Sequence, residues 1–155
     1  MKAVRLFISV LVPLVIGGVA GLFTANAIPL WYEQLIQPSF NPPNQVFGPV
    51  WTTLYLLMGI SCYRIWIQPA GEEKRRALLV YALQLFLNFC WSFIFFYFQL
   101  IGWALVEIIL LWISILVMIR LFYRIDKVSA WLNIPYLLWV SFATILNAAY
   151  FYLNG

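Results

Sequence analysis

Five apolar runs, separated by short polar stretches, dominate this sequence and restrict what it can fold into. Crossing a bilayer takes roughly 20 consecutive apolar residues in an α-helix. The runs predict membrane-spanning helices at about 6–27, 46–66, 78–98, 102–123 and 131–153. Only 9% of the residues are charged, against roughly 25% in soluble domains. We therefore expect one all-α membrane domain over 1–155, a five-transmembrane-helix bundle.

The basic residues predict the orientation of these helices. All nine lie at the N-terminus or at the second-to-third and fourth-to-fifth connections: Lys2, Arg5, Arg64, Lys74, Arg75, Arg76, Arg120, Arg124 and Lys127. None lies in the loop 28–45, the turn 99–101 or the C-terminal tail. By the positive-inside rule this alternation predicts a multi-pass cell-membrane protein with its N-terminus cytoplasmic and its C-terminus outside.

The net charge of +4 is therefore interpreted as a collar of basic residues at the cytoplasmic leaflet, attracted to anionic lipid headgroups. Nucleic-acid binding is not expected, because it requires a folded basic surface with polar readers of the bases.

The first apolar run has a second interpretation as a cleaved signal peptide, since Ala25-Asn26-Ala27 resembles a cleavage site. Its apolar stretch is longer than the 7–15 residues of a signal peptide, which favours a retained helix. Gly17 and Gly21 form a small-xxx-small spacing that lets another helix approach closely. Either the bundle core or a dimer contact could use it.

Histidine is absent, and the two cysteines, Cys62 and Cys90, lie in different predicted helices. Histidine is the commonest metal and haem ligand, and the carboxylates are too sparse for a hard-metal cage. We expect no metal site and no required cofactor. A bound tetrapyrrole would be held by stacking, shape and hydrogen bonds, with a cysteine or tyrosine ligand as the alternative.

Polar and aromatic residues recur at helical spacing inside the predicted spans, where they cost free energy. The i, i+4, i+8 sets are Gln84/Asn88/Ser92, Trp51/Tyr55/Gly59 and Trp139/Ala143/Asn147. Interhelical hydrogen bonds and interfacial aromatic belts are the simpler explanation. Each stripe also sets polar or aromatic groups beside a small residue, as a cavity wall does. The proline-rich loop before Trp51 predicts a pocket mouth at one membrane surface.

Four segments together resemble the TspO/translocator protein family, also called the tryptophan-rich sensory or peripheral-type benzodiazepine receptor family. They are the stretch 31–66 with its Pro42-Pro43 pair, QLFLNFCW (84–91), GWALVE (102–107) and PYLLWVSFATILN (135–147). The likeness covers all five predicted helices in order, although the first, mostly Val, Leu, Ile and Gly, adds little specificity.

The resemblance implies a five-helix bundle, usually a homodimer, that binds porphyrins such as protoporphyrin IX and isoquinoline carboxamide or benzodiazepine-type drugs. Bacterial members are linked to light-dependent oxidative degradation of protoporphyrin, which would assign photochemical roles to Trp51 and Trp139. The resemblance places the pocket among the first, second and fifth helices and the first loop, with the third and fourth helices contributing. The ligand-binding candidates by motif position are Trp31, Tyr32, Trp51, Tyr55, Asn88, Trp91, Glu107, Trp139, Ala143 and Leu146.

Three departures from the family pattern bear on these expectations. Phe40 stands where the family often has Trp, and Glu107 replaces the usual Asp. No basic residue follows Lys127, so the C-terminal cholesterol-recognition pattern of animal members is absent and sterol transport is not expected.

Two functions remain open at this point. The chain either promotes photooxidative porphyrin degradation or acts as a porphyrin transporter or stress sensor without chemistry. No Ser/His/Asp set, metal cluster or acid–base pair marks conventional catalysis, which leaves enzymatic activity undecided.

Overall fold

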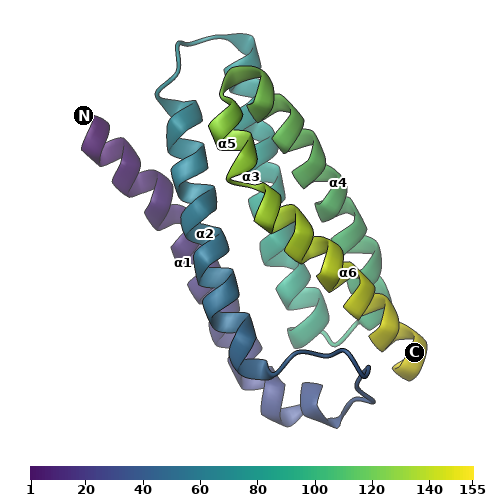
Figure 1. Cartoon of the computed structure of the whole chain (residues 1–155). Helices are drawn as coiled ribbons and strands as arrows, with labels where there is room; N and C mark the ends of the chain where they lie inside the picture. The colour runs from purple at the N-terminus through teal and green to yellow at the C-terminus, as the bar shows by residue number, and fades with distance from the viewer.

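The computed structural model describes residues 1–155 and consists of helices joined by short connections (Figure 1). The elements are α1 (Lys2–Leu30), η1 (Tyr32–Gln34), α2 (Asn44–Trp66), α3 (Glu72–Ser92), η2 (Phe93–Tyr97), α4 (Ile101–Ile125), α5 (Lys127–Trp131) and α6 (Ile134–Asn154). Five helical segments are long and apolar enough to cross a membrane. These findings confirm the predicted all-α, five-helix architecture.

The first four helices begin before their predicted spans, because polar end turns were outside the apolar runs. The predicted fifth span, 131–153, is instead divided: α5 ends at Trp131 and α6 begins at Ile134, where Pro135 lacks the amide hydrogen that would continue the earlier helix. The third helix begins at Glu72, six residues before the expected 78, and its first turn carries Glu72 and Glu73. Acidic side chains are favourable near the positive end of a helix dipole. Glu72 also accepts a hydrogen bond from Arg76 at 3.1 Å. The expected loop 28–45 is accordingly shorter, with α1 ending at Leu30 and α2 beginning at Asn44.

The two ends of the bundle differ in chemistry. At one, here called the basic end, lie the N-terminus and the α2–α3 and α4–α5 connections; at the other, the loop end, lie residues 31–43, the α3–α4 turn and the C-terminus (Figure 1). The basic residues cluster at or near the first of these ends.

Helix α4 packs against α3, α5 and α6. Its buried side chains include Ile108, Leu111, Ile115 and Met118. Helix α1 is the most peripheral, with only Ser9, Pro13 and Ala20 buried. Its apolar outer face is what a helix surrounded by lipid requires.

Two glycines allow α1 and α2 to cross closely. A Cβ at Gly59 of α2 would lie 2.6 Å from the Val10 Cα, and a Cβ at Gly17 of α1 would overlap the Tyr55 ring. Real atoms cannot approach this closely, so both positions require glycine. Of the two uses left open for Gly17, the structure supports packing within the bundle. A Cβ placed at Gly21 would have no atom within 4 Å, so this glycine does not mark a close helix contact.

An ion pair closes the basic end. The Arg64 guanidinium donates to both Asp126 carboxylate oxygens, at 2.7 and 3.0 Å. Asp126 also caps α5 by accepting from the Ser129 amide at 3.0 Å. The Arg64 hydrogen bond, supported by those from Ser129, holds the pKa of Asp126 well below its usual range. This pair joins α2 to the start of α5.

Candidate functional site

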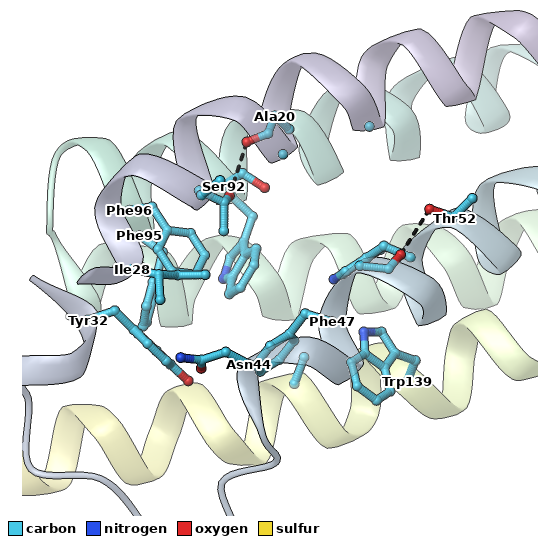
Figure 2. A pocket seen from close by; sticks show the side chains of 18 of the residues that line it. Ala20, Ile28, Tyr32, Asn44, Phe47, Thr52, Ser92, Phe95, Phe96 and Trp139 are labelled. Carbon is cyan, nitrogen blue, oxygen red and sulfur yellow. Dashed lines mark hydrogen bonds between the residues drawn. The ribbon is translucent and has the colours of Figure 1, made fainter. Parts of the chain in front are cut away.

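A cavity of about 450 Å³ lies in the loop-end half of the bundle, among α1, α2, the end of α3 with η2, and α6 (Figure 2). Its size falls within the range of small-molecule sites, roughly 300–1,000 Å³. Aromatic rings make up much of its wall: Tyr32, Phe47, Trp51, Tyr55, Trp91, Phe95, Phe96, Trp139 and Tyr150. None of the residues lining it is charged.

Trp51 has a defined orientation because it packs on two tyrosines. Its ring stacks on Tyr55 with centroids 5.6 Å apart and an interplanar angle of 27°, and meets Tyr136 edge-on at 6.3 Å. Trp139, across the cavity on α6, contacts Phe47 at 6.1 Å and Phe142 at 5.5 Å. Indole rings thus line the cavity from two helices.

A short π-helix brings two neighbouring phenylalanines to the cavity. The chain winds more widely over Phe93–Tyr97, after α3 ends at Ser92. Phe95 and Phe96 both line the cavity as a result. Neighbouring side chains are about 100° apart around a regular α-helix. The wider turn of a π-helix brings them closer in direction, which fits both rings lining the same cavity. No pattern in the sequence marked this turn.

A buried chain of hydrogen bonds supports the cavity wall from behind. The Tyr55 hydroxyl donates to Asn88 Oδ1 at 2.6 Å, and Asn88 Nδ2 donates to the Tyr136 hydroxyl at 3.0 Å. That hydroxyl in turn donates to Gln84 Oε1 at 2.8 Å. The predicted polar stripe of α3 therefore serves mainly to fix α2 and α6 against it.

A second polar contact fixes Trp91. Its indole Nε1 donates to Asn147 Oδ1 at 3.1 Å, and Asn147 Nδ2 donates to the Ile101 carbonyl at 3.0 Å. Trp91 also stacks on Phe95 with centroids 5.3 Å apart. The bond places the end of α3 against α6 on the cavity wall.

Side-chain hydrogen bonds hold the loop over the end of the bundle. Asn154, in the last turn of α6, accepts from the Ile36 amide at 2.8 Å and donates to the Ile36 carbonyl at 3.1 Å. The Tyr32 hydroxyl donates to Asn41 Oδ1 at 2.9 Å. Residues 33–43 do not line the cavity; the loop covers its end without forming its wall.

Seven of the ten candidate ligand-binding residues line this one cavity: Tyr32, Trp51, Tyr55, Trp91, Trp139, Ala143 and Leu146. The other three do not line it. Trp31 packs edge-on against Phe95 at 5.5 Å, and Asn88 lies behind Tyr55. Glu107 is buried in α4, and neither carboxylate oxygen has a hydrogen-bond partner.

The family resemblance placed the first helix at the pocket, but no residue of α1 was among the ligand-binding candidates. This helix supplies more of the lining than any other, through Leu14, Gly17, Gly18, Ala20, Gly21, Thr24, Ala25 and Ile28. These are small or aliphatic side chains, which look like any lipid-facing helix in a sequence. The run of small residues was the only signal that could have indicated a wall here.

Two polar groups of the cavity wall have no hydrogen-bond partner. They are Trp139 Nε1 and the hydroxyl of Tyr150, whose residue is only 1% exposed. Buried donors are usually satisfied. Each atom is itself buried, so it can donate to a ligand only if its side chain turns towards the cavity. No group of three metal-binding side chains lies together in the structure.

Comparison with known proteins identifies the family. The model of the TspO/MBR family matches residues 9–153. The chain belongs to the TspO/MBR family. The resemblance found in the sequence is thereby confirmed, and the five apolar helices are those of a multi-pass membrane protein.

Curated members of the TspO/MBR family are similar to the chain over most of its length. The tryptophan-rich protein TspO of Archaeoglobus fulgidus is 40% identical over 155 residues, covering all of both chains. That of Chlorobaculum tepidum is 38% identical over 144 residues, or 91% of this chain and 90% of its own. The human translocator protein is 40% identical over 119 residues, covering 76% of this chain and 70% of its own.

Proposed function

We propose that this member of the TspO/MBR family binds porphyrins in the aromatic cavity. The observation that carries the proposal is a wall of nine aromatic residues with no charged side chain. A planar macrocycle buries a large apolar area, and indole and phenol rings offer it stacking faces. Its carboxylates would stay outside the cavity, because nothing cationic lines it.

Titration with protoporphyrin IX tests this proposal. The protein in detergent micelles should show saturable quenching of tryptophan fluorescence, because Trp51, Trp91 and Trp139 all line the cavity. Quenching that rises linearly and never saturates would reflect partition into micelles and would contradict a defined site.

Drugs of the isoquinoline carboxamide and benzodiazepine types should compete for the same cavity. Each carries a carbonyl group that could accept from the unpartnered Trp139 Nε1. We expect such a carboxamide to reverse the porphyrin quenching. Binding of both ligands at once would show that they occupy different sites.

We further propose that light drives oxidative loss of the bound porphyrin. An excited porphyrin takes one electron from the Trp51 or Trp139 indole, leaving an indole cation radical and a porphyrin anion radical. Dioxygen takes the extra electron from the porphyrin and becomes superoxide. The indole cation radical then takes one electron from the macrocycle and becomes indole again. The porphyrin cation radical combines with the superoxide, forming the carbon–oxygen bond that begins breakdown of the ring.

The light-driven step is tested by a matched pair of double variants. Trp51→Phe/Trp139→Phe removes both cavity indoles, whereas Trp103→Phe/Trp131→Phe removes two that are 68% and 65% exposed. Under illumination the first pair should slow the loss of porphyrin absorbance by roughly tenfold or more, an effect of about 1.4 kcal/mol on the barrier. The second pair should change little. Equal rates of porphyrin loss in the unmodified protein and both double variants would contradict the photochemical proposal.

A carrier or sensor without chemistry is the second candidate. The uncharged lining favours it, because an acid–base pair would be expected for conventional catalysis. In this case the spectrum of bound porphyrin stays the same in light and darkness. Porphyrin efflux from vesicles containing the protein would then support transport.

The assembly and orientation of the protein are also proposals. We propose a homodimer with the basic end in the cytoplasm, supported by the positive-inside rule for the orientation. Labelling of a single cysteine at Gly71 or Gly155, in a chain lacking Cys62 and Cys90, would report which end a membrane-impermeant reagent can reach.

A further inference from the structure

The cavity has exposed lining residues on one side only. Gly18, Gly21 and Ala25 of α1 and Gly48 and Thr52 of α2 all line the cavity and are exposed. The lining residues from α3, η2 and α6 are buried or half-buried. The cavity therefore opens between α1 and α2. These five residues are called the portal.

The portal is wide because its side chains are small. A Cβ placed at Gly18, Gly21 or Gly48 would meet nothing within 4 Å. These positions differ from Gly17, where a Cβ would overlap the Tyr55 ring because α1 and α2 are in contact there. The helices thus touch at Gly17 and are separated by open space towards the loop end.

The portal lies at the depth of the lipid tails. Leu30 ends α1, so Gly18 and Ala25 lie roughly 18 and 8 Å from that end at 1.5 Å per residue. Thr52 lies roughly 12 Å from the start of α2 at Asn44 by the same rise. The hydrocarbon core is about 30 Å thick. An opening at this position faces acyl chains.

The loop end offers no comparable opening. Tyr32, which lines the cavity there, is only 3% exposed and is bonded to Asn41. The loop itself is fastened to α6 by the two hydrogen bonds between Ile36 and Asn154. A ligand entering from water would have to break these contacts.

Beyond the portal, the buried end of the cavity has features of a binding site. The Tyr150 hydroxyl and Trp139 Nε1 lie on its wall without partners, and Tyr150 is almost fully buried. Figure 2 shows Trp139 of α6 across the cavity from α1, the helix that carries Ala20. The portal therefore leads from lipid to the aromatic wall that carries these two residues.

We propose that the porphyrin ligand exchanges with the bilayer through the portal between α1 and α2, while the loop stays closed. This inference rests on the proposed porphyrin binding and adds the route. A ligand that dissolves in lipid is concentrated where the portal opens. Ligand release into the same membrane needs no contact with water.

Thr52 and Thr53 provide a matched test of the route. Both are exposed, and each hydroxyl donates to the carbonyl four residues earlier at 2.9 Å. Thr52 lines the portal, whereas Thr53 does not line the cavity. Thr52→Phe should obstruct the opening, and Thr53→Phe places the same ring beside it on the lipid-facing surface.

The loop is tested separately by locking it. Ile36→Cys/Asn154→Cys, in a chain with Cys62→Ala and Cys90→Ala, would tie the loop to α6 by a disulfide. Residues 36 and 154 are already joined by two hydrogen bonds, which makes the link geometrically reasonable. The cysteine-free chain is the reference, and reduction of the disulfide is the internal control.

Stopped-flow fluorescence in detergent micelles measures protoporphyrin IX exchange in these proteins. Association follows mixing with porphyrin-loaded micelles, and dissociation follows dilution into excess empty micelles. In Thr52→Phe dissociation as well as association should slow, each by roughly tenfold or about 1.4 kcal/mol in barrier height. A ring that only weakened binding would not slow dissociation. Thr53→Phe and the locked loop should exchange at the rates of their parent chains.

The opposite pattern overturns the inference. Slow exchange in the locked loop with normal rates in Thr52→Phe would show entry past the loop. Equal slowing by Thr52→Phe and Thr53→Phe would show a general effect of added rings. Absence of saturable binding in the unmodified protein would instead refute the proposed function, and the portal with it.

Discussion

The Tyr55 hydroxyl donates a hydrogen bond of 2.6 Å to Asn88 Oδ1, and this contact joins the cavity wall to the core of the bundle. The ring of Tyr55 stacks on Trp51, and its hydroxyl reaches α3. Asn88 in turn donates a hydrogen bond to the Tyr136 hydroxyl of α6. The aromatic wall is therefore held in place from three helices before any ligand binds.

Removing this hydroxyl should destabilise the bundle while leaving the stacked ring. In Tyr55→Phe the Asn88 oxygen loses its buried donor, at a cost of about 0.5–2 kcal/mol in the free energy of unfolding. Tyr152→Phe is the matched control, since Tyr152 is 86% exposed. Thermal unfolding in detergent checks the pair. Equal melting temperatures would show that the contact contributes nothing to stability.

The two glycines of the first helix should respond oppositely to alanine. Gly17→Ala forces the Tyr55 ring to move, which typically costs 1–3 kcal/mol in overpacked cores. At Gly21 nothing lies within 4 Å of a Cβ, and alanine gains up to about 1 kcal/mol in helix propensity. Unfolding in detergent should rank Gly21→Ala above Gly17→Ala. The reverse order would mean that α1 and α2 do not cross at Gly17.

The Arg64–Asp126 pair should make the stability of the fold depend on pH in the acidic range. Because the pKa of Asp126 is lowered in the folded state, its contribution is present above the unfolded pKa of about 3.9 and is lost as pH falls towards the folded value. Asp126→Asn should lower the melting temperature at neutral pH and flatten its decline below about pH 4. Glu72→Gln, which removes an exposed pair with Arg76, is the control. Parallel acid curves for wild type and Asp126→Asn would contradict this role.

The loop should loosen when its tie to the last helix is removed. Asn154→Ala takes away both hydrogen bonds to the Ile36 backbone. Amide exchange at Ile36 should then accelerate by roughly tenfold or more, as expected when a closed segment opens locally. Asn44→Ala removes the hydrogen bond between Glu33 of the loop and the start of α2 but leaves both Ile36 bonds in place, and it serves for comparison. Unchanged protection at Ile36 would show that other contacts hold the loop.

Hydropathy and charge were sufficient to predict the five helices, since each crossing requires a long apolar run whatever its partners are. The motif positions also placed Trp51, Trp139 and five other residues on one cavity, because aromatic and small residues at helical spacing share a face. Where those faces point depends on packing between helices. The stripe of α3 shows this: Asn88 turns to Tyr55 and Tyr136 instead of lining the cavity.

Other parts of the site had no signal in the sequence. The π-helix at Phe93–Tyr97 follows from how α3 packs and ends, and it brings Phe95 and Phe96 to the wall. The clasp between Asn154 and Ile36 joins residues 118 positions apart. The lining from α1 consists of residues that look like any lipid-facing helix. Each depends on contacts that only the folded chain creates.

The central claim is that the aromatic cavity is the porphyrin site, and two alanines of α6 test it most directly. Ala143 lines the cavity, whereas Ala148 is exposed and does not. We expect Ala143→Leu to weaken protoporphyrin IX binding at least roughly tenfold, or about 1.4 kcal/mol, in equilibrium fluorescence titrations, while Ala148→Leu binds like the wild type. Equal affinity in all three proteins would show that porphyrin binds elsewhere.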